Sequence, residues 1–576
     1  MPNGAPTAGR DEADQQTTEA VSHFAHMKWW GWGEEHVAFT HADKPALAPF
    51  VRAHLGVDLD APPTARPSFE ALDVPPGRAG AGLRARLEGI VGAAHVSDDA
   101  LDRVVHTYGK SLRDLVRVRR GDLGRLPDLV LTPGSEAEVS EIVQLALEEN
   151  AVVIPFGGGT NIAGSLEPPP EESRPVLSID LGRMDRVLDV DAVSGLARVQ
   201  AGVRGPSLEA QLNARGFTLG HFPDSFAHST LGGWIATRSS GMQSDKYGDI
   251  ADITRALRVV TPTGLLATRP VPSTSTGPSV REMVLGSEGR LGVITEATVH
   301  VHRVPEVRTI LAYFFPTWSA ALAAMRDIAA SDATPSVTRV SDARETQFSL
   351  ATKRAPTIVD RLQSTALKLY LRRRRGYDLA EMCLSFIGFE GAAAHVKSQR
   401  KAVGRLVSRH GGTCVGAGPG ELYDQKKFDT PYIRDFLLDR GVYADVSETS
   451  APWAGLGPLY DTVVADAQRA FAAIGVRGWI MCHLSHSYHA GACLYFTFAF
   501  TPSTANDGLA QYDAVKSAIQ QAFVDNGATL SHHHGVGLEH ARWLEQDLSP
   551  AGAAMIQVLV DGVDPGRNFN PGKIVR

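Results

Sequence analysis

The fold of this chain is decided by the stretch Val152-Val153-Ile154-Pro155-Phe156-Gly157-Gly158-Gly159-Thr160-Asn161. Its first residues are apolar and β-branched, which predicts a short buried strand. The strand runs directly into three glycines, whose backbone N–H groups are not screened by side chains. Such a loop can cradle a pyrophosphate. An ordinary turn is the alternative, because the loop has neither the GxGxxG spacing of a dinucleotide fingerprint nor the GK[ST] ending of a P-loop.

The residues before this stretch predict a first strand followed by a helix. Asp128–Leu131 has the apolar character of a strand. Ser135 and Glu138 have the spacing of a capping box at the start of a helix. Apolar residues then recur at helical spacing: Val139, Ile142, Val143 and Ala146. The segment is therefore predicted to be β-α-β with a glycine-rich loop.

Two later stretches, residues 224–241 and 286–295, are also dense in glycine and hydroxyl residues. Such residues suit a flat polar cofactor threaded between backbone segments. Each stretch alone is typical of a Ser/Gly loop, but three such loops at strand ends favour one shared cofactor site. The candidate cofactor-binding residues are Pro155, Phe156, Gly157, Gly158, Gly159, Thr160, Asn161, Asp224, Ser225, Phe226, Ala227, His228, Ser229, Thr230, Thr237, Arg238, Ser239, Ser240, Glu288, Gly289, Arg290, Leu291, Gly292, Val293 and Ile294.

The composition is that of an ordinary globular protein, with 576 residues, 43% hydrophobic, 21% charged and a net charge of −7. The negative balance argues against a general nucleic-acid binder. The 4 cysteines contain no CxxC pair, which fits a reducing intracellular compartment rather than a disulfide framework. No apolar run reaches the ~18 residues needed to span a bilayer.

Changes in residue composition and pattern divide the chain into five segments. We expect a disordered leader (1–20), an N-terminal layer (21–124), a nucleotide-binding domain (125–305), a cap domain with mostly helical patterns (306–525) and a C-terminal segment of glycine-rich loops (526–576) that completes the active site.

A triple histidine lies in the last segment, in Ser531-His532-His533-His534-Gly535-Val536-Gly537. On an extended backbone His532 and His534 would share one face and His533 would lie on the other. The two glycines allow the chain to turn sharply and to approach a ligand. The tract suits proton transfer or anion stabilisation, and a solvated or metal-binding histidine tract is the alternative.

The three loops resemble the FAD-binding domain of the vanillyl-alcohol oxidase and p-cresol methylhydroxylase superfamily. The matching motifs are Pro155-Phe-Gly-Gly-Gly-Thr-Asn161, Leu231-Gly-Gly-Trp234, Gly286-Ser-Glu-Gly-Arg-Leu-Gly-Val-Ile-Thr295 and, at the end of the chain, Phe569-Asn-Pro-Gly-Lys573. The resemblance implies an α+β protein with a two-subdomain FAD-binding domain of p-cresol methylhydroxylase type. It also implies a substrate (cap) domain of the FAD-linked oxidase C-terminal type. No residue matches the family's flavin-linking His or Cys, so FAD is expected to bind noncovalently.

Nearly the whole chain after the leader is similar to the alkyldihydroxyacetonephosphate synthase family of ether-lipid enzymes. The matching motifs are Met27-Lys-Trp-Trp-Gly-Trp-Gly33, Tyr432-Ile-Arg-Asp435, Glu448-Thr-Ser-Ala-Pro-Trp453, Gly491-Ala-Cys-Leu-Tyr-Phe496 and the triple histidine. The resemblance implies that the acyl chain of acyl-dihydroxyacetone phosphate is exchanged for a long-chain fatty alcohol without an external electron acceptor. It makes Tyr495 the proton donor and acceptor, Arg434 the ligand of the substrate phosphate, and His532, His533 and His534 residues required for activity.

The residues themselves support this chemistry. Arginine presents a rigid fork that pairs with phosphate. A tyrosine beside a flavin and cationic neighbours can have a lowered pKa and take a proton from carbon. The alternatives are a surface ion pair for Arg434 and a core aromatic for Tyr495.

Three features depart from related patterns. The metal-holding His-x-Gly-Asp-Gly-Asn-x-His stretch of 2-hydroxy-acid dehydrogenases is absent after His486, and His533 stands where those enzymes have a carboxylate, so no metal is expected. His483, His486 and His489 are interpreted as pocket-lining residues, with a metal site as the alternative. Ser273 occupies a position where the synthases carry an arginine, and Arg269, four residues earlier, is the candidate substitute.

Residues 358–375 are apolar at helical spacing and end in four arginines. This pattern suits an interfacial helix on anionic lipid, or a basic helix end within the cap domain. We expect a cytoplasmic homodimer with peripheral contact at the inner membrane face and no nucleic-acid partner. An FAD-dependent oxidoreductase acting on an alcohol or 2-hydroxy acid is the alternative function, and an inactive flavoprotein scaffold is a third.

Overall fold

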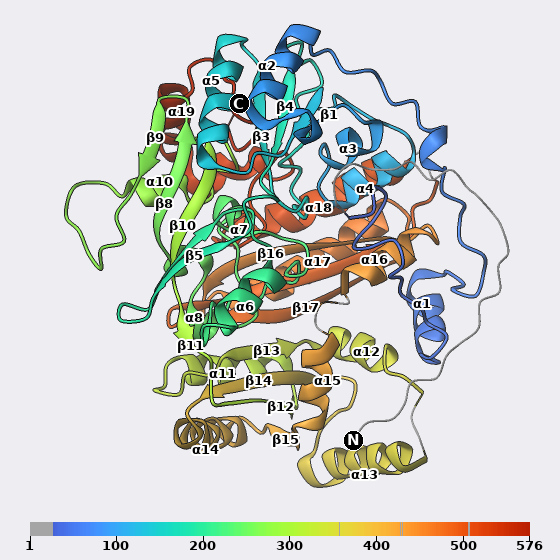
Figure 1. The fold of residues 1–576 in the computed structure, drawn as a ribbon. Coiled ribbons are helices and arrows are strands. Elements are labelled where there is room, and N and C mark those ends of the chain that lie inside the picture. Colours follow the sequence, from blue (N-terminus) through green and yellow to red (C-terminus); the bar gives the residue numbers. More distant parts are fainter. Residues whose placement is uncertain (1–26, 356–357, 427, 429, 505–506, 576) are drawn as a thin grey trace, which may run out of the picture.

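The computed structural model describes residues 27–355, 358–426, 428, 430–504 and 507–575. The expected leader lies outside these residues. Figure 1 shows two regions built on β-sheets. The upper region carries the three glycine-rich loops, and the lower region contains the sheet of the expected cap domain, called the cap sheet below. The mixture of helix and sheet confirms the predicted α+β class.

The upper region begins with a mixed sheet in the order β1-β2-β4-β3. Its strands are β1 (Val96–Ser97), β2 (Leu129–Leu131), β3 (Val152–Phe156) and β4 (Val176–Asp180). β2, β4 and β3 pair in parallel, which confirms the β-α-β prediction. Helix α5 (Glu136–Glu148) connects β2 to β3, and the hydroxyl of its N-cap Ser135 accepts the Glu138 amide at 3.2 Å. The nearby helices are α2 (Ala81–Val91), α3 (Ala100–Val105) and α4 (Leu112–Arg119).

An antiparallel sheet follows in the order β5-β6-β10-β8-β9. Its strands are β5 (Val187–Asp191), β6 (Leu196–Gln200), β8 (Thr254–Thr261), β9 (Gly264–Ala267) and β10 (Val293–His300). A small pair is formed by β7 (Phe217–Thr218) and β11 (His302–Arg303). The helices are α6 (Gly205–Asn213), α7 (Leu231–Thr237), α8 (Ser244–Tyr247), α9 (Ile250–Ile253) and α10 (Val280–Val284). One hydrophobic core joins both sheets and includes residues of α2 and the C-terminal Phe569.

The lower region is organised, within the described residues, by a seven-stranded antiparallel sheet in the order β15-β12-β14-β13-β17-β18-β16. Its strands are β12 (Val307–Phe315), β13 (Val337–Ser341), β14 (Cys383–Gly391), β15 (Thr413–Gly416), β16 (Tyr443–Pro452), β17 (Gly478–Ser487) and β18 (Gly491–Phe500). The helices are α11 (Trp318–Ala329), α12 (Ala343–Ala351), α13 (Ile358–Arg375), α14 (Ala393–Arg409), α15 (Gly418–Lys426), α16 (Thr430–Leu438), α17 (Leu456–Ala473) and α18 (Gly508–Asp525). The sequence pattern of this segment is mostly helical, with Cys493–Phe498 as a strand-like stretch; that stretch lies in β18, but the extent of the sheet was not predicted. Several strands are buried on both faces, so they lack a clear two-residue alternation.

Both ends of the described chain pack onto the sheet regions, the N-terminal end onto the lower one and the C-terminal end onto the upper one. Helix α1 (Leu47–Leu55) packs in one core with Leu437 of α16, and the Trp32 amide donates to the Asp435 carboxylate at 2.6 Å. At the other end, Phe569 forms a bridge to Val153 of β3. The C-terminal segment contains a long helix, α19 (Leu544–Val563), kinked at Ser549 where φ is 70°. The expectation that this segment consists of loops is therefore wrong.

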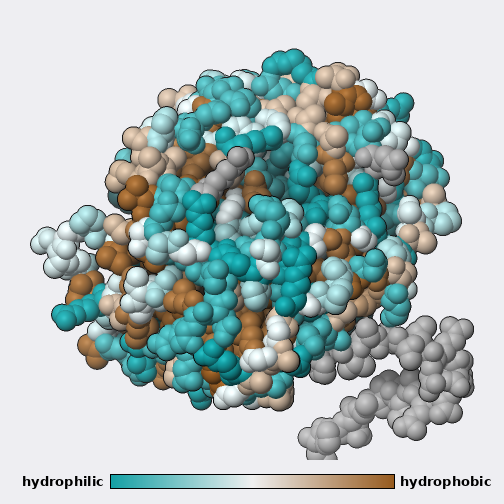
Figure 2. Space-filling view, turned by 90° about the horizontal axis from the view of Figure 1, so that it is seen from above, coloured by the Kyte–Doolittle hydropathy of each residue, from teal (hydrophilic) through white to brown (hydrophobic). Residues whose placement is uncertain are grey.

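Figure 2 shows one face of the molecule, seen from above the view of Figure 1, where hydrophobic residues lie in small groups between hydrophilic ones. This mixed surface is usual for globular proteins. Among the described residues no helix combines the length and the apolar character needed to cross a membrane.

Candidate active site

A cavity of about 820 Å³ lies where the loops of the upper region meet the cap sheet. The sequence-predicted residues that line it are Pro155, Phe156, Gly157, Gly158, Gly159, Thr160, Asn161, Asp224, Ser225, Ser229, Thr230, Thr237, Ser239, Ser240, Glu288, Gly289, Gly292, Ile294, Arg434, Tyr495, His533 and His534. The predicted residues outside its lining are Phe226, Ala227, His228, Arg238, Arg290, Leu291, Val293 and His532. The structure thus gathers all three loops, the phosphate candidate and two of the three histidines around one cavity.

The glycine loop is shaped for close approach to a ligand. A Cβ atom on Gly158 would overlap the carbonyl oxygen of His228, and one on Gly157 would overlap the Thr230 hydroxyl. The first loop therefore packs directly on the second. The backbone amides of residues 157–161 have no hydrogen-bond partner among the described residues. Unpaired N–H groups beside a cavity are what a pyrophosphate requires, so the loop fits the predicted cofactor.

We expect Gly158→Ala to expel the cofactor. The added Cβ meets a backbone atom, which cannot rotate away, and overpacking of this kind costs roughly 1–3 kcal/mol. Purified variant should contain much less flavin, measured by absorbance near 450 nm after denaturation. Gly404→Ala is the control, because Gly404 lies within α14 with nothing within 4 Å of its Cβ position. A Gly158→Ala protein with full flavin content would contradict the assignment of this loop.

Glu288 joins the third loop to the segment that follows the triple histidine. Its carboxylate accepts the Val536 amide at 2.6 Å, the Gly537 amide at 2.9 Å and the Ser165 hydroxyl at 2.6 Å. Gly537 has φ +52°, and its Cβ would overlap the Ala163 carbonyl oxygen. The sharp turn predicted from the glycines is confirmed, and it docks the histidine tract on the cofactor loops.

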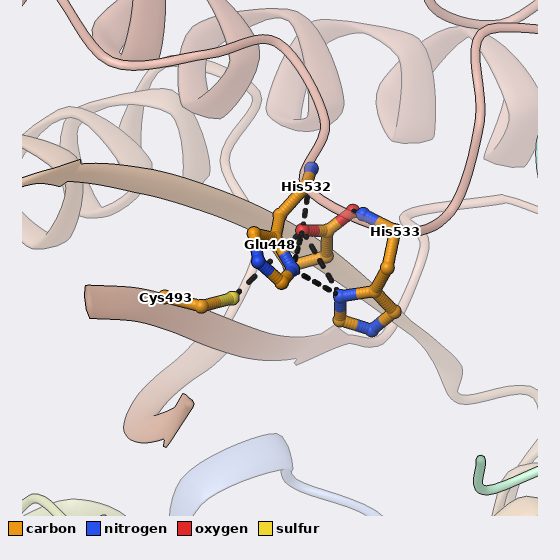
Figure 3. Close-up of side chains that lie close together, drawn as sticks. All are labelled: Glu448, Cys493, His532 and His533. Carbon is orange, nitrogen blue, oxygen red and sulfur yellow. Dashed lines mark hydrogen bonds and ion pairs between the residues drawn. The ribbon is translucent and has the colours of Figure 1, made fainter. Parts of the chain in front are cut away.

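The triple histidine surrounds the carboxylate of Glu448 on β16, and Figure 3 shows this carboxylate beside His532 and His533. The backbone amides of His532, His533 and His534 all donate to it, at 2.7, 3.0 and 3.0 Å. The Ser531 hydroxyl adds a fourth hydrogen bond at 2.8 Å. Successive amides that converge on one anion form a curved backbone nest. The expectation of an extended segment with alternating rings is therefore wrong, and the rings of His532 and His533 instead meet at 2.9 Å between their Nδ1 atoms.

Four side chains here place possible metal-ligating atoms within 4.8 Å of one another, in the part of the chain that the structure describes: Glu448, Cys493, His532 and His533. Their hydrogen bonds already occupy these atoms: the carboxylate accepts from the Ser531 hydroxyl, the three histidine amides and the Cys493 thiol, and the two Nδ1 atoms bond each other. Burial raises the pKa of the Cys493 thiol well above its ordinary value, so the sulfur is not a thiolate. We interpret the cluster as a hydrogen-bond network.

The imidazoles that line the cavity are neutral. Burial lowers the pKa of His533 to about 3 and that of His534 to about 4. Burial also raises the pKa of Tyr495 well above its ordinary value, with further contributions from the carboxylates of Asp224 and Glu448. A cationic neighbour is present, because Arg339 acts to lower the pKa of Tyr495, but burial outweighs it and the predicted lowered tyrosine pKa is wrong for this structure. Sequence spacing gives no measure of burial, which is the largest cause here.

His540 supports the turn that follows the histidines. Its Nδ1 donates to the Gly535 carbonyl at 2.8 Å, and its Nε2 lies 3.2 Å from the Gln520 amide nitrogen. Burial lowers the pKa of His540 to about 4. A histidine in an unfolded chain titrates near ~6.5. Between these two values the unfolded chain binds one more proton than the native protein, so acid destabilises the fold through this residue.

We expect His540→Gln to remove this pH dependence. Through His540 the wild-type free energy of unfolding should fall by about 1.4 kcal/mol for each pH unit between about pH 6 and pH 5. Urea unfolding of both proteins at about pH 7.5, 6 and 5 measures the difference in slope. His36→Gln is the control, because that side chain is 78% exposed. Identical slopes for wild type and His540→Gln would show that His540 is charged in the native protein.

Arg434 extends from α16 to the cavity with unused hydrogen-bonding capacity. Its Nη1 donates to the Lys110 carbonyl at 2.5 Å. Its Nε and Nη2 are buried and have no hydrogen-bond partner in the described structure. A buried guanidinium with two unpaired donors beside a cavity fits an anionic ligand, and excludes the alternative of a surface ion pair.

The histidines at positions 483, 486 and 489 do not form one cluster. His483 and His486 are buried and line the cavity, whereas His489 is exposed at the β17–β18 turn. The Nδ1 of His483 lies 2.8 Å from the Glu345 carboxylate. The structure therefore does not bring the three together.

The loop between β9 and α10 carries Ser273 and projects from the upper region in Figure 1. Ser273 and Arg269 are both exposed and neither lines the cavity. In this structure Arg269 therefore does not supply the missing arginine.

Sequence reasoning missed Glu448 and Asp249 as parts of the site. Glu448 lies within a motif that matched the synthases, but nothing in its neighbours indicates that it accepts the amides of residues 532–534. Asp249 lies just before α9, next to Ser239 and Ser240 of the second loop in space. No sequence pattern connects it to the histidines.

Comparisons with known proteins first define the class. Residues 127–268 match the family "FAD binding domain", and residues 304–574 match "FAD linked oxidases, C-terminal domain". The solved structure of p-cresol methylhydroxylase has the same fold, with a TM-score of 0.63 at 15% identity over 87% of this chain and 98% of that one. The protein is thus an FAD-linked enzyme of the p-cresol methylhydroxylase fold, and FAD is its cofactor.

Two closer relatives define the family. The alkyldihydroxyacetonephosphate synthase of Dictyostelium discoideum is 39% identical, over 98% of this chain and 96% of its own. A solved alkyldihydroxyacetonephosphate synthase has a TM-score of 0.82 at 38% identity, covering 95% of this chain and 99% of that one. The chain belongs to the alkyldihydroxyacetonephosphate synthase family.

Proposed function

We infer that this protein is a flavin-dependent alkyldihydroxyacetonephosphate synthase, which exchanges the acyl chain of acyl-dihydroxyacetone phosphate for a long-chain fatty alcohol. The observation that carries this inference is the make-up of the cavity. It joins the cofactor loops to Arg434, Tyr495 and the histidines within one continuous space. An anion-binding arginine, proton-transfer groups and a flavin site are the parts that the reaction requires.

The cavity also has an arm suited to an aliphatic chain. This apolar arm is the part of the cavity lining formed by aromatic and aliphatic side chains of one hydrophobic cluster, which come from α1 and the segment before it, α12, α16 and the cap sheet and include Phe39, Phe50, Phe348 and Trp479. Phe50 contacts both Phe348 and Trp479, with ring centroids 5.8 and 5.3 Å apart. Apolar walls bind alkyl chains by removing them from water. A small hydroxy acid has no long alkyl chain to fill such an arm.

Each polar residue receives a role from its position. Arg434 holds the phosphate through its two unpaired donors. Tyr495, stacked 4.8 Å from the His483 ring, makes no hydrogen bond through its hydroxyl in the described structure, so the phenol is available to donate a proton. His532, His533 and His534 form the polar wall around Glu448. When bound, noncovalently, between the three loops, FAD supplies an electrophilic ring system beside the substrate.

The oxidoreductase alternative is tested by the flavin itself. An oxidoreductase of an alcohol or 2-hydroxy acid would lose its yellow colour when substrate is added without oxygen, and an acceptor would restore it. We expect hexadecanol and 2-hydroxy acids to leave the absorbance unchanged. Rapid bleaching by any of them, with recovery on adding an acceptor, would replace the proposed function by the alternative.

We further propose peripheral contact with an anionic membrane through α13. The helix exposes Leu369 (48%) and Tyr370 (46%), and Arg372–Arg375 form its last turn. The cavity residues Ser349, Thr352 and Arg354 lie in the last turn of α12 and just after it, in the segment that precedes α13 in the chain. Membrane contact there would bring the apolar arm close to its lipid substrates.

Reversing the charges of Arg372, Arg373 and Arg374 should weaken binding to anionic vesicles. Each basic residue near such a surface contributes about 1 kcal/mol, so the triple glutamate variant is expected to bind roughly 100-fold more weakly in a sedimentation assay. Arg375 is left in place because it donates to the Gly411 and Gly412 carbonyls. The control reverses three exposed arginines of the upper region: Arg186, Arg198 and Arg269. Equal loss of binding in both triple variants would exclude α13 as the contact.

Three further expectations are retained as proposals. We propose that the protein is a homodimer, which light scattering can measure. We also propose that it is cytoplasmic and lies at the inner face of the membrane. Its cysteines are free in the structure, which fits a reducing compartment. We also propose the division into a leader, an N-terminal layer, an FAD-binding domain, a cap domain and a C-terminal segment, with boundaries near residues 20, 124, 305 and 525.

A further inference from the structure

A chain of hydrogen bonds runs from the cavity to a carboxylate outside it. The Nδ1 atoms of His533 and His532 lie 2.9 Å apart. The Nε2 of His532 lies 2.6 Å from the Tyr488 hydroxyl. That hydroxyl donates to the Asp249 carboxylate at 2.8 Å. His533 lines the cavity, while His532, Tyr488 and Asp249 do not.

The partners in this chain decide which nitrogen of each ring carries hydrogen. Burial opposes ionisation of Asp249, but the imidazoles of His532 and His486 in their charged forms, together with hydrogen bonds that include Tyr488, outweigh it and lower the pKa of Asp249. The hydrogen bond from Tyr488 does not depend on the charge of His532, so the carboxylate only accepts. Tyr488 must give its single proton to Asp249 and therefore accepts from His532 Nε2–H. When His532 is neutral, its Nδ1 has a lone pair, which accepts the Nδ1–H of His533.

This assignment leaves the Nε2 of His533 without a proton at the cavity surface. Burial keeps the His533 ring neutral, with a pKa lowered to about 3, so one nitrogen is bare. Nε2 makes no hydrogen bond to any described residue. The ring stacks at 19° on Tyr495, with centroids 6.0 Å apart. A bare imidazole nitrogen beside a protonated phenol is the stronger base of the two.

We propose that His533 Nε2 is the base that receives the hydroxyl proton of the incoming alcohol. Asp249, Tyr488 and His532 are positioning residues, which fix the tautomer of His533 and offset the charge that it gains. The inference rests on the proposed function and names the proton acceptor within it. It also separates the roles of the three histidines, since His532 orients and His533 moves the proton.

With this arrangement every bond and proton in the exchange is accounted for. The bond between C1 of dihydroxyacetone phosphate and the acyl carboxylate oxygen breaks, and a bond from C1 to the alcohol oxygen forms. The alcohol O–H breaks, and its proton passes to His533 Nε2. The fatty acid departs as a carboxylate, and His533 releases the proton that accompanies it. Any proton that Tyr495 donates during the exchange returns to Tyr495 before the next turnover, so no oxidant or reductant is consumed.

Substitution of Tyr488 by Phe tests the chain without touching the cavity lining. Removal of an orienting partner typically costs 10- to 100-fold. We expect Tyr488→Phe and Asp249→Asn to lower kcat for exchange by about 10- to 100-fold, with KM for both substrates and flavin content unchanged. Tyr460→Phe is the matched control, because its hydroxyl also donates to an aspartate, Asp342, at 2.9 Å. If Tyr488→Phe keeps the same kcat as Tyr460→Phe, the relay is wrong.

A second measurement does not depend on activity. ¹⁵N NMR of histidine-labelled protein reports which ring nitrogen carries hydrogen, with the His533→Gln spectrum assigning the signal. We expect His533 to be protonated at Nδ1 in wild type and to become a mixture of tautomers in Tyr488→Phe. A wild-type signal from Nε2–H overturns the relay even if exchange occurs. A wild type that makes no alkyl product overturns the proposed function, while the NMR result still decides the hydrogen-bond chain.

Discussion

Tyr495→Phe should lower kcat for acyl-to-alkyl exchange by about 10²- to 10⁴-fold, which is the usual contribution of a positioned proton donor. The phenol lies in the cavity wall, and its hydroxyl has no hydrogen-bond partner among the described residues. Removing one oxygen therefore breaks no structural contact. Because burial raises the pKa of Tyr495 well above its ordinary value, the residue begins the reaction as an acid. The variant should keep its flavin, its folding stability and its KM values.

Tyr313→Phe provides the control for this prediction. Tyr313 is a buried tyrosine of β12 in the same sheet, outside the lining of the cavity. Quenched time courses with mass-spectrometric detection of alkyl product give kcat for both variants. Retention of more than about a tenth of wild-type kcat in Tyr495→Phe, against the factor of at least ~10² expected, would remove the phenol from the mechanism.

Arg434→Met should raise KM for the phosphate-bearing substrate by about 100- to 1,000-fold. Loss of one partner from a buried, hydrogen-bonded charge pair costs roughly 2–5 kcal/mol, and in the proposed function the partner of Arg434 is the substrate phosphate. The two unpaired donors, Nε and Nη2, match the geometry of a bidentate phosphate contact. Lysine keeps the charge but not the fork, so Arg434→Lys should recover only part of the loss.

KM for hexadecanol serves as an internal control, because the alcohol carries no phosphate and should bind equally well to both variants. Arg440→Met is the matched control, since Arg440 donates to the Leu59 and Phe436 carbonyls and lies outside the cavity lining. A rise in KM that is equal for both substrates would indicate a distorted cavity rather than a lost phosphate contact.

Local patterns in the sequence were sufficient for much of the upper region. The cap of α5, the strand β3 and the glycine loop depend on residues close in sequence, and the structure has them where they were predicted. The cap sheet was harder to predict from local sequence patterns. Its central strands are buried on both faces, and its order β13-β17-β18-β16 joins residues far apart in the chain.

The chemistry of the site depends on contacts that no local pattern contains. Glu448 determines the backbone path of the triple histidine from 84 residues away. Tyr488 reaches Asp249 across 239 residues. Motifs identified the candidates Tyr495 and Arg434, but their surroundings, and therefore their protonation and free donors, appear only when distant segments pack together.

Exchange without an electron acceptor is the central claim of this account. The most direct measurement is an anaerobic incubation of the purified yellow protein with palmitoyl-dihydroxyacetone phosphate and hexadecanol, followed by quantification of hexadecyl-dihydroxyacetone phosphate and palmitate. We predict that the two products form in equal amounts, over many turnovers, with the flavin still oxidised at the end. Release of palmitate with no alkyl product, or alkyl product that appears only when an electron acceptor is added, would contradict the account.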